Sequence, residues 1–110
     1  MPEIVTVPER KAREAARRRA AALDVMTEAR EFARTRGGRF YVFGSVAAGR
    51  IKYDSDFDVV VDFPFGIEAE AADFVEEACQ RRRLPSDVHL KSRASKRFLD
   101  RIRDQMVSLP

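Results

Sequence analysis

The chain has 110 residues, of which 45% are hydrophobic, so it can bury one core but is too short for a catalytic domain with a separate substrate domain. Its net charge of only +3 does not indicate direct nucleic-acid binding. A single cysteine, Cys79, excludes an intrachain disulfide, and a single histidine, His89, excludes a metal site built on Cys/His spacing. No apolar run approaches the roughly 20 residues that span a bilayer, and the N-terminus lacks the apolar core of a signal peptide. We therefore expect a cytoplasmic protein without membrane contact.

The first third of the chain predicts one long helix. After an extended lead-in over residues 1–7, Ala, Arg and Glu dominate residues 8–36, and these are good helix formers. Pro8 suits a first helical turn, and Gly37 with Gly38 suits a helix end. Residues 10–19 have only alanines to bury, so we expect this segment to face solvent or a partner. The apolar stripe comes later, at Ala22, Val25, Met26, Ala29, Phe32 and Ala33.

The rest of the chain alternates between strand and helix periodicity. The expected elements are a strand over 39–43, a small-residue turn with one helical turn over 44–49, a loop over 50–55, a strand over 57–63, a helix over 67–83, a strand over 86–91, and a last helix over about 94–107 with Ser92 or Ser95 as its N-cap. This order predicts a single domain over residues 1–110, with a catalytic core over about 39–91. The fold class is α/β (α+β), with a small mixed β-sheet of three or more strands packed against helices.

Two carboxylates lie together at the start of the second predicted strand. Asp56 and Asp58 are two residues apart, so both point to the same face of a strand. Like charges this close repel each other unless a cation lies between them, and Mg²⁺ or Mn²⁺ is the cation expected with only oxygen ligands. Asp87, near the start of the next strand, joins this cluster if the two strands are neighbours. Three carboxylates can then hold two metals about 4 Å apart, as in nucleotidyl transfer.

The turn after the first strand has the composition of a phosphate site. Gly44 lets backbone approach a ligand closely, and the start of a helix presents free N–H groups to phosphate. The Ser45 hydroxyl adds a donor. The alternatives left open are an ordinary turn at Gly44 and Ser45, a solvated strand face for the carboxylates, and a turn or N-cap role for Asp87. Ser55 is either a turn residue of the preceding loop or a support of the site.

These residues together resemble a known signature. Phe43-Gly44-Ser45, then Gly49, then Ser55-Asp56-Phe57-Asp58 resembles the G-S-x(3)-G-x(5)-S-D-x-D pattern of the polymerase-β-like nucleotidyltransferase superfamily. In particular it resembles the minimal nucleotidyltransferases of prokaryotic two-gene systems. The resemblance extends to Asp87 and to a closing helix that ends within residues 102–109. It implies a nucleotidyltransferase fold, ATP as substrate and two Mg²⁺ or Mn²⁺ ions. The implied metal-binding and catalytic residues are Asp56, Asp58 and Asp87, and the implied nucleotide-binding residues are Gly44, Ser45, Arg50 and Ser55.

The resemblance also implies a function with named alternatives. Such proteins often act as antitoxins that pair with a helical toxin of the HEPN class, and some transfer AMP to a toxin tyrosine, with Asp87 assisting deprotonation of the acceptor. Many relatives carry an arginine where this chain has Ala48, which makes Arg50 or Lys52 the candidate phosphate cation. The first alternative is an antitoxin that neutralises its partner by contact alone within a hetero-oligomer. The second is nucleotidyl transfer to a small molecule such as an aminoglycoside, which usually requires an added substrate domain.

Overall fold

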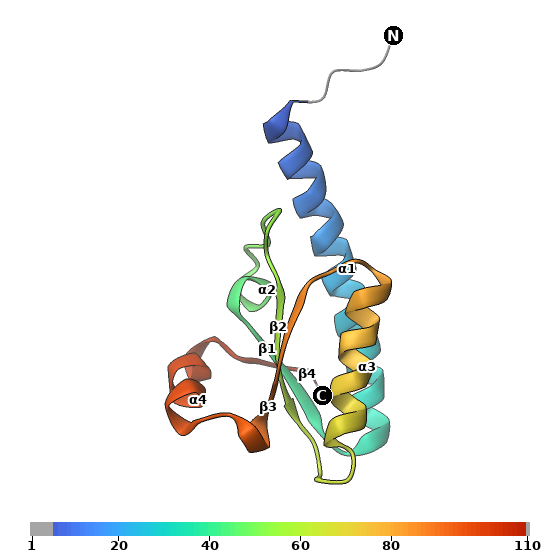
Figure 1. Cartoon of the computed structure of the whole chain (residues 1–110), viewed down its shortest axis with the longest axis vertical. Helices are drawn as coiled ribbons and strands as arrows, with labels where there is room; N and C mark the ends of the chain where they lie inside the picture. The colour runs from blue at the N-terminus through green and yellow to red at the C-terminus, as the bar shows by residue number, and fades with distance from the viewer. Residues whose placement is uncertain (1–5, 110) are drawn as a thin grey trace.

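The computed structural model describes residues 6–109. Its elements form one long helix followed by alternating short strands and helices (Figure 1). In chain order they are α1 (Val7–Arg36), β1 (Arg39–Phe43), α2 (Gly44–Ala48), β2 (Phe57–Asp62), α3 (Glu68–Arg81), β3 (Ser86–Leu90), the 3₁₀ turn η1 (Lys91–Arg93), α4 (Lys96–Ile102), the 3₁₀ turn η2 (Arg103–Gln105) and β4 (Val107–Leu109).

Both ends of α1 follow the local chemistry of the sequence. The Thr6 hydroxyl caps the first turn by accepting a hydrogen bond from the Glu9 amide, with 3.2 Å between the two atoms. Gly37 ends the helix in the left-handed conformation, at φ +72°, and its N–H donates to the Ala33 carbonyl. The helix predicted over 8–36 is therefore confirmed, beginning one residue earlier. Residues 1–5 of the expected lead-in lie outside the described residues.

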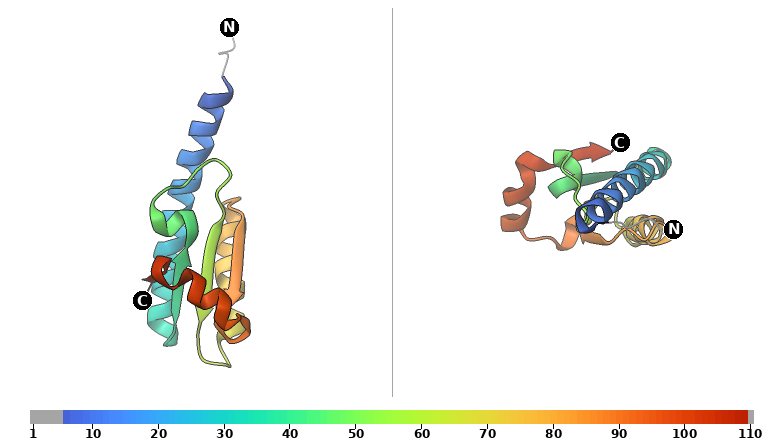
Figure 2. Two further views of the ribbon diagram at one scale, coloured as in Figure 1. Left: turned by 90° about the vertical axis from the view of Figure 1, so that its left-hand side faces the viewer. Right: turned by 90° about the horizontal axis from the view of Figure 1, so that it is seen from above.

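Four strands form a mixed sheet in the order β3-β2-β1-β4. β1 pairs antiparallel with β2 and with β4, whereas β2 pairs parallel with β3. Figure 2 shows α1 and α3 on one side of this sheet and α4 on the other. The predicted fold class, a small mixed sheet packed against helices, is confirmed.

The alternation of side chains along the strands divides the core in two. Phe40, Phe57 and Val59 face α1 and α3 and belong to the larger buried cluster. Phe43 and Val60 face the opposite way and pack with Ile102 of α4. Asp58 and Asp62 alternate with the first set along β2, so they lie on the α4 side of the sheet. In residues 6–109, no helix is long and apolar enough to cross a membrane.

The C-terminal helix predicted over 94–107 is wrong in its second half. α4 ends at Ile102, and after η2 the chain forms the edge strand β4, whose Leu109 pairs with Phe40 of β1. Leu109 is fully buried in the larger cluster. The helical spacing of the apolar residues continues to Met106, but the open edge of β1 offers backbone hydrogen bonds and a core position that override it. Of the two predicted N-caps, Ser95 takes the role: its hydroxyl accepts from the Phe98 amide at 3.0 Å.

Smaller boundary differences have local causes. β2 ends at Asp62 instead of residue 63, directly before the Phe63-Pro64 turn. The helix predicted over 67–83 spans Glu68–Arg81. The strand predicted over 86–91 ends at Leu90, because Lys91 begins η1.

Candidate active site

The sheet register brings two of the predicted carboxylates together. β2 and β3 run parallel, and Asp58 is the direct register partner of Asp87. On the other side of β2, Asp58 pairs with Phe43, the last residue of β1. The condition set for Asp87 is therefore met, because its strand neighbours β2 and Asp87 lies beside Asp58. Asp56 lies just before the first residue of β2, not within the strand as predicted, and it is exposed.

Gly44 is held directly against the Asp58 carboxylate. It follows Phe43 and begins α2 with φ at +69°, a conformation that residues with a side chain rarely adopt. A Cβ atom at this position would overlap Asp58 Oδ2. Two separate physical reasons therefore favour glycine at position 44: the left-handed backbone conformation and the close contact with the Asp58 carboxylate.

Negative charge accumulates at Asp58. Burial, first, and the neighbouring Asp87 and Asp56 together raise the pKa of its half-buried carboxyl from 3.8 to about 6, while His89 lowers it. Both of the other predicted carboxylates therefore act electrostatically on Asp58. A cation bound beside Asp58 would neutralise these carboxylates and so favour the ionised form of Asp58.

The short helix α2 connects the glycine positions of the motif. Ser45 lies in its first turn and is half-buried, while Ala48 is exposed at its end. Gly49 terminates α2 with φ at +68°, and the Arg50 amide donates to the Ser45 carbonyl at 2.9 Å. Gly49 is therefore a C-cap, and its left-handed conformation is the reason for a second glycine at this spacing.

Ser55 closes the loop that leads to Asp56. Its hydroxyl accepts a hydrogen bond from the Lys52 amide at 2.7 Å, and its own amide donates to the Lys52 carbonyl at 3.2 Å. Its carbonyl accepts from Arg18 Nη1 at 2.8 Å. Ser55 thus has the turn role that was one of its two predicted readings. Arg50 and Lys52, the candidate phosphate cations, are both exposed in this loop.

Comparison with known proteins agrees with this geometry. The family model of the nucleotidyltransferase domain matches residues 26–109. The chain belongs to the nucleotidyltransferase domain family. The match runs from the middle of α1 to the end of β4, so it includes both motif glycines and all three carboxylates. No curated protein and no solved structure gives a match.

The residues of this nucleotidyltransferase domain that would hold a metal are the three carboxylates. Among residues 6–109, no three His, Cys, Asp or Glu side chains lie close enough to enclose an ion. The donor chemistry nevertheless fits a hard divalent cation, because Asp58 and Asp87 are register partners and all three donors are carboxylates. Burial and, after it, the charges of Asp87 and Asp56 raise the pKa of Asp58, and a bound cation would oppose both effects. Asp56, Asp58 and Asp87 are the candidate ligands for such a cation, and of these Asp58 and Asp87 are paired in the sheet.

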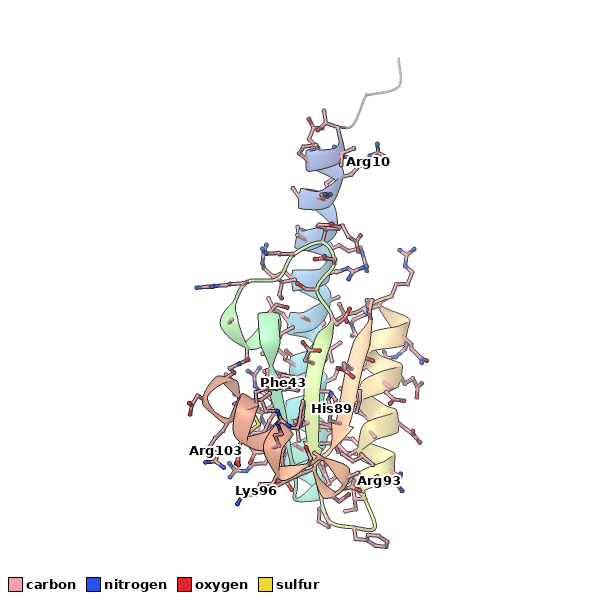
Figure 3. The ribbon with its side chains drawn as sticks, turned by 60° about the vertical axis from the view of Figure 1, so that its left-hand side comes forward. Arg10, Phe43, His89, Arg93, Lys96 and Arg103 are labelled. Atoms are coloured by element: carbon pink, nitrogen blue, oxygen red, sulfur yellow. The ribbon has the colours of Figure 1, made fainter. Side chains whose placement is uncertain are left out.

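His89 lies beside the site although its side chain is part of the packing against α4. Its ring packs against both Phe43 and Phe98, with centroid distances of 5.8 Å and 4.6 Å. Figure 3 shows His89 and Phe43 on neighbouring parts of the sheet behind α4. Its Nε2 lies 3.1 Å from Asp87 Oδ2, but the pair lacks hydrogen-bond alignment and Nε2 has no hydrogen-bond partner. The two aromatic contacts make His89 a packing residue on the α4 side of the sheet. Asp87 and His89 are two residues apart on one strand, and this spacing indicates that their side chains lie on the same face.

Proposed function

We propose that this nucleotidyltransferase domain transfers a nucleoside monophosphate, AMP from ATP, to a hydroxyl group on a partner protein in a reaction that requires a divalent metal. Family membership supports nucleotidyl transfer in general. The single observation that carries the proposal is the pairing of Asp58 with Asp87, with Gly44 packed against the Asp58 carboxylate. This observation supports the proposal because Gly44 belongs to the expected phosphate-binding turn, and Asp58 and Asp87 are two of the three expected metal ligands.

Each residue of the site has a role that follows from its position. Gly44 allows the backbone of the turn to lie against the carboxylates, and Ser45 supplies a hydroxyl in the first turn of α2. Arg50 and Lys52 are the cations available for the triphosphate, since Ala48 has no charge. Asp87 would assist deprotonation of the acceptor hydroxyl, as the family resemblance implies. A divalent cation held by Asp56, Asp58 and Asp87 would supply neutralisation of the charge that develops on the phosphoryl oxygens.

The proposed biological role is that of an antitoxin whose partner is a helical toxin of the HEPN class. The support is the resemblance of the motif, from Gly44 to Asp58, to the minimal nucleotidyltransferases of two-gene systems. The product of the adjacent gene is the natural acceptor to test, and an R-x(4)-H motif in a small helical product would identify the toxin class.

The test is label transfer from ATP. The purified chain is incubated with Mg²⁺, α-labelled ATP and the neighbouring gene product, and the acceptor is analysed for label. We expect transfer with the unaltered chain and none with Asp56→Ala plus Asp58→Ala. Asp62→Ala is the matched control, because Asp62 lies on the same strand and sheet face but pairs with Lys91. No label with any acceptor, or label that survives the double substitution, would refute the proposal.

Neutralisation by contact alone is the second candidate. The observation in its favour is the exposed Ala48, where relatives carry a cation. The two functions separate in one experiment: growth rescue from the partner should be lost with Asp56→Ala plus Asp58→Ala if transfer neutralises it. If rescue persists while the partner stays unlabelled, contact is the mechanism.

A further inference from the structure

The strand that carries Asp87 forms one edge of the sheet. β3 is the outermost strand in the order β3-β2-β1-β4, and the left view of Figure 2 shows it at the margin of the sheet, in front of α3. It spans five residues and contains neither lysine nor proline, which often protect exposed edge strands. The other edge strand, β4, has only three residues. Of the two edges, β3 therefore offers the longer row of backbone groups for pairing.

The hydrogen bonds between β2 and β3 decide which backbone groups of β3 face outward. In a parallel pair, the N–H and C=O of one residue point to the neighbouring strand, and those of the next residue point away. The Phe57 amide donates to the Pro85 carbonyl at 2.8 Å, and Phe57 is the register partner of Ser86. The carbonyl before Ser86 thus points to β2, and the backbone groups of Ser86 itself point away from it.

This alternation continues to the end of β3. Asp87 and His89 direct their N–H and C=O groups toward β2. The backbone groups of Val88 and the N–H of Leu90 point to the outer side, while the Leu90 carbonyl accepts from the Ala94 amide at 3.0 Å. Among residues 6–109, no hydrogen bond outside the sheet involves Val88. Val88 therefore has a donor and an acceptor available to a further strand.

The outer side of β3 is accessible. A hollow of about 260 Å³ lies at the C-terminal end of the strand and is lined by Val88, His89, Leu90, Arg93 and Ala94. Ser86 and Asp87 are exposed at its other end. An added strand would lie about 4.8 Å from β3, and the hollow can receive one of its side chains.

A strand paired with this edge would lie directly beside the carboxylates. Asp87 is the register partner of Asp58, so both side chains lie on the α4 side of the sheet. Because the backbone groups of Asp87 point to β2, the residue opposite it in an added antiparallel strand belongs to a non-hydrogen-bonded pair. The Cα atoms of such a pair are about 4.5 Å apart, and the two side chains point to the same face. A hydroxyl side chain at that position is within reach of Asp87.

We propose that an extended segment of the acceptor protein pairs with the outer edge of β3 and thereby places a hydroxyl side chain beside Asp87. This inference rests on the proposed transfer function and adds how the acceptor is held. Backbone groups at strand spacing select another extended backbone, because a helix satisfies its own N–H and C=O groups. Transfer to the docked hydroxyl forms a bond between its oxygen and the α-phosphorus of ATP and breaks the bond to pyrophosphate. The hydroxyl proton passes to the base, the role proposed above for Asp87.

The experiment detects strand pairing without requiring transfer. The ¹⁵N-labelled chain, in EDTA, is mixed with a short peptide in which threonine alternates with valine between terminal lysines, since threonine and valine favour extended backbone. Exchange of each backbone amide with solvent is measured by NMR. The matched control peptide carries proline in place of the valines, which removes the donors that would pair with Val88.

We expect the Val88 and Leu90 amides to exchange about threefold more slowly when the free peptide concentration is twice its Kd, and not to respond to the proline peptide. The Asp87 and His89 amides, which point to β2, are the internal controls. Protection at β4 instead of β3, or at no strand, would overturn the inference. Protection of β3 that is present without peptide and grows with chain concentration would also overturn it, because it indicates pairing with a second copy of the chain.

A pair of variants tests the outward N–H of Val88. Val88→Pro removes this donor and leaves the groups that point to β2 in place, whereas Val88→Ala removes most of the same side chain and keeps the donor. We expect the peptide to bind Val88→Pro about tenfold more weakly than Val88→Ala, and equal affinities would contradict the pairing. Circular dichroism checks that both variants fold, and the exchange measurement on the unaltered chain decides the matter if Val88→Pro does not.

Docking and transfer can fail separately. The same peptide is incubated with the chain, Mg²⁺ and α-labelled ATP, and its threonines are analysed for label. Protection of β3 without label on the peptide or on the neighbouring gene product would uphold the docking and refute the transfer. Label on the peptide without protection of β3 would overturn the docking.

Discussion

The contact between Gly44 and Asp58 predicts a measurable coupling between two motif positions. Gly44 and Gly49 have nearly the same backbone conformation, at φ +69° and +68°. They differ in their surroundings: a Cβ at Gly44 would overlap Asp58 Oδ2, whereas a Cβ at Gly49 would meet nothing within 4 Å. Alanine at either position has the same backbone cost, and only alanine at Gly44 also displaces the carboxylate.

The magnitudes follow from these two contributions. A left-handed conformation costs an alanine roughly 1–2 kcal/mol, so Gly49→Ala should lower the free energy of unfolding by about that amount. Overpacking typically adds 1–3 kcal/mol, so we expect Gly44→Ala to cost about 1–2 kcal/mol more than Gly49→Ala. In an Asp58→Ala background the overlap is gone, and the two alanine substitutions should then cost nearly the same.

The assay is urea unfolding followed by circular dichroism in EDTA, in which the three single alanine variants and the two double variants are compared through double-mutant cycles. Gly49→Ala combined with Asp58→Ala serves as the control and should show additive effects. The contact with Asp58 does not explain the glycine at position 44 if Gly44→Ala and Gly49→Ala lower the free energy of unfolding equally in the unaltered background. The same conclusion follows if Asp58→Ala leaves the difference between them unchanged.

Three further predictions concern other parts of the molecule. Burial and the adjacent carboxylates raise the pKa of Asp58 to about 6, so its ionised form destabilises the fold above that pH, and the cost disappears as the pH falls towards 3.8. The full difference between the two pKa values corresponds to about 3 kcal/mol of unfolding free energy, and the expected effect is smaller because Asp58 is partly exposed to solvent. Asp58→Asn should therefore stabilise the metal-free chain by about 1 kcal/mol at pH 8 and by less at pH 5, and equal gains at both values would contradict this. Leu109→Ala should cost about 2–4 kcal/mol in urea unfolding, because Leu109 is fully buried; Val107→Ala, at an exposed position of the same strand, should cost far less. Burial raises the pKa of the Cys79 thiol to about 12, so we expect Ellman's reagent to label the native chain only after denaturation; rapid native labelling would show that α3 opens.

Local spacing in the sequence was sufficient for most elements and for the turn of the site. The limits of α1 follow from Thr6, Pro8 and Gly37, whose effects act within one helical turn. β1 has the predicted bounds, because alternation and flanking glycines are local signals. The proximity of Gly44, Gly49 and Asp56 along the chain could be used for the same reason, since α2 and its loop connect these positions directly.

Contacts between distant segments were decided only by the tertiary structure. Nothing in the spacing of Asp87 establishes that β3 lies next to β2 and parallel to it; the packing of α3 across the sheet does. β4 forms because β1 has an open edge and Leu109 fills a core position, although the local pattern there is helical. The packing of the His89 ring against Phe43 and Phe98, which belong to two other elements, was likewise a tertiary contact. The residues of the site were thus identifiable from local chemistry, whereas their convergence depends on strand pairing, which is a non-local property of the chain.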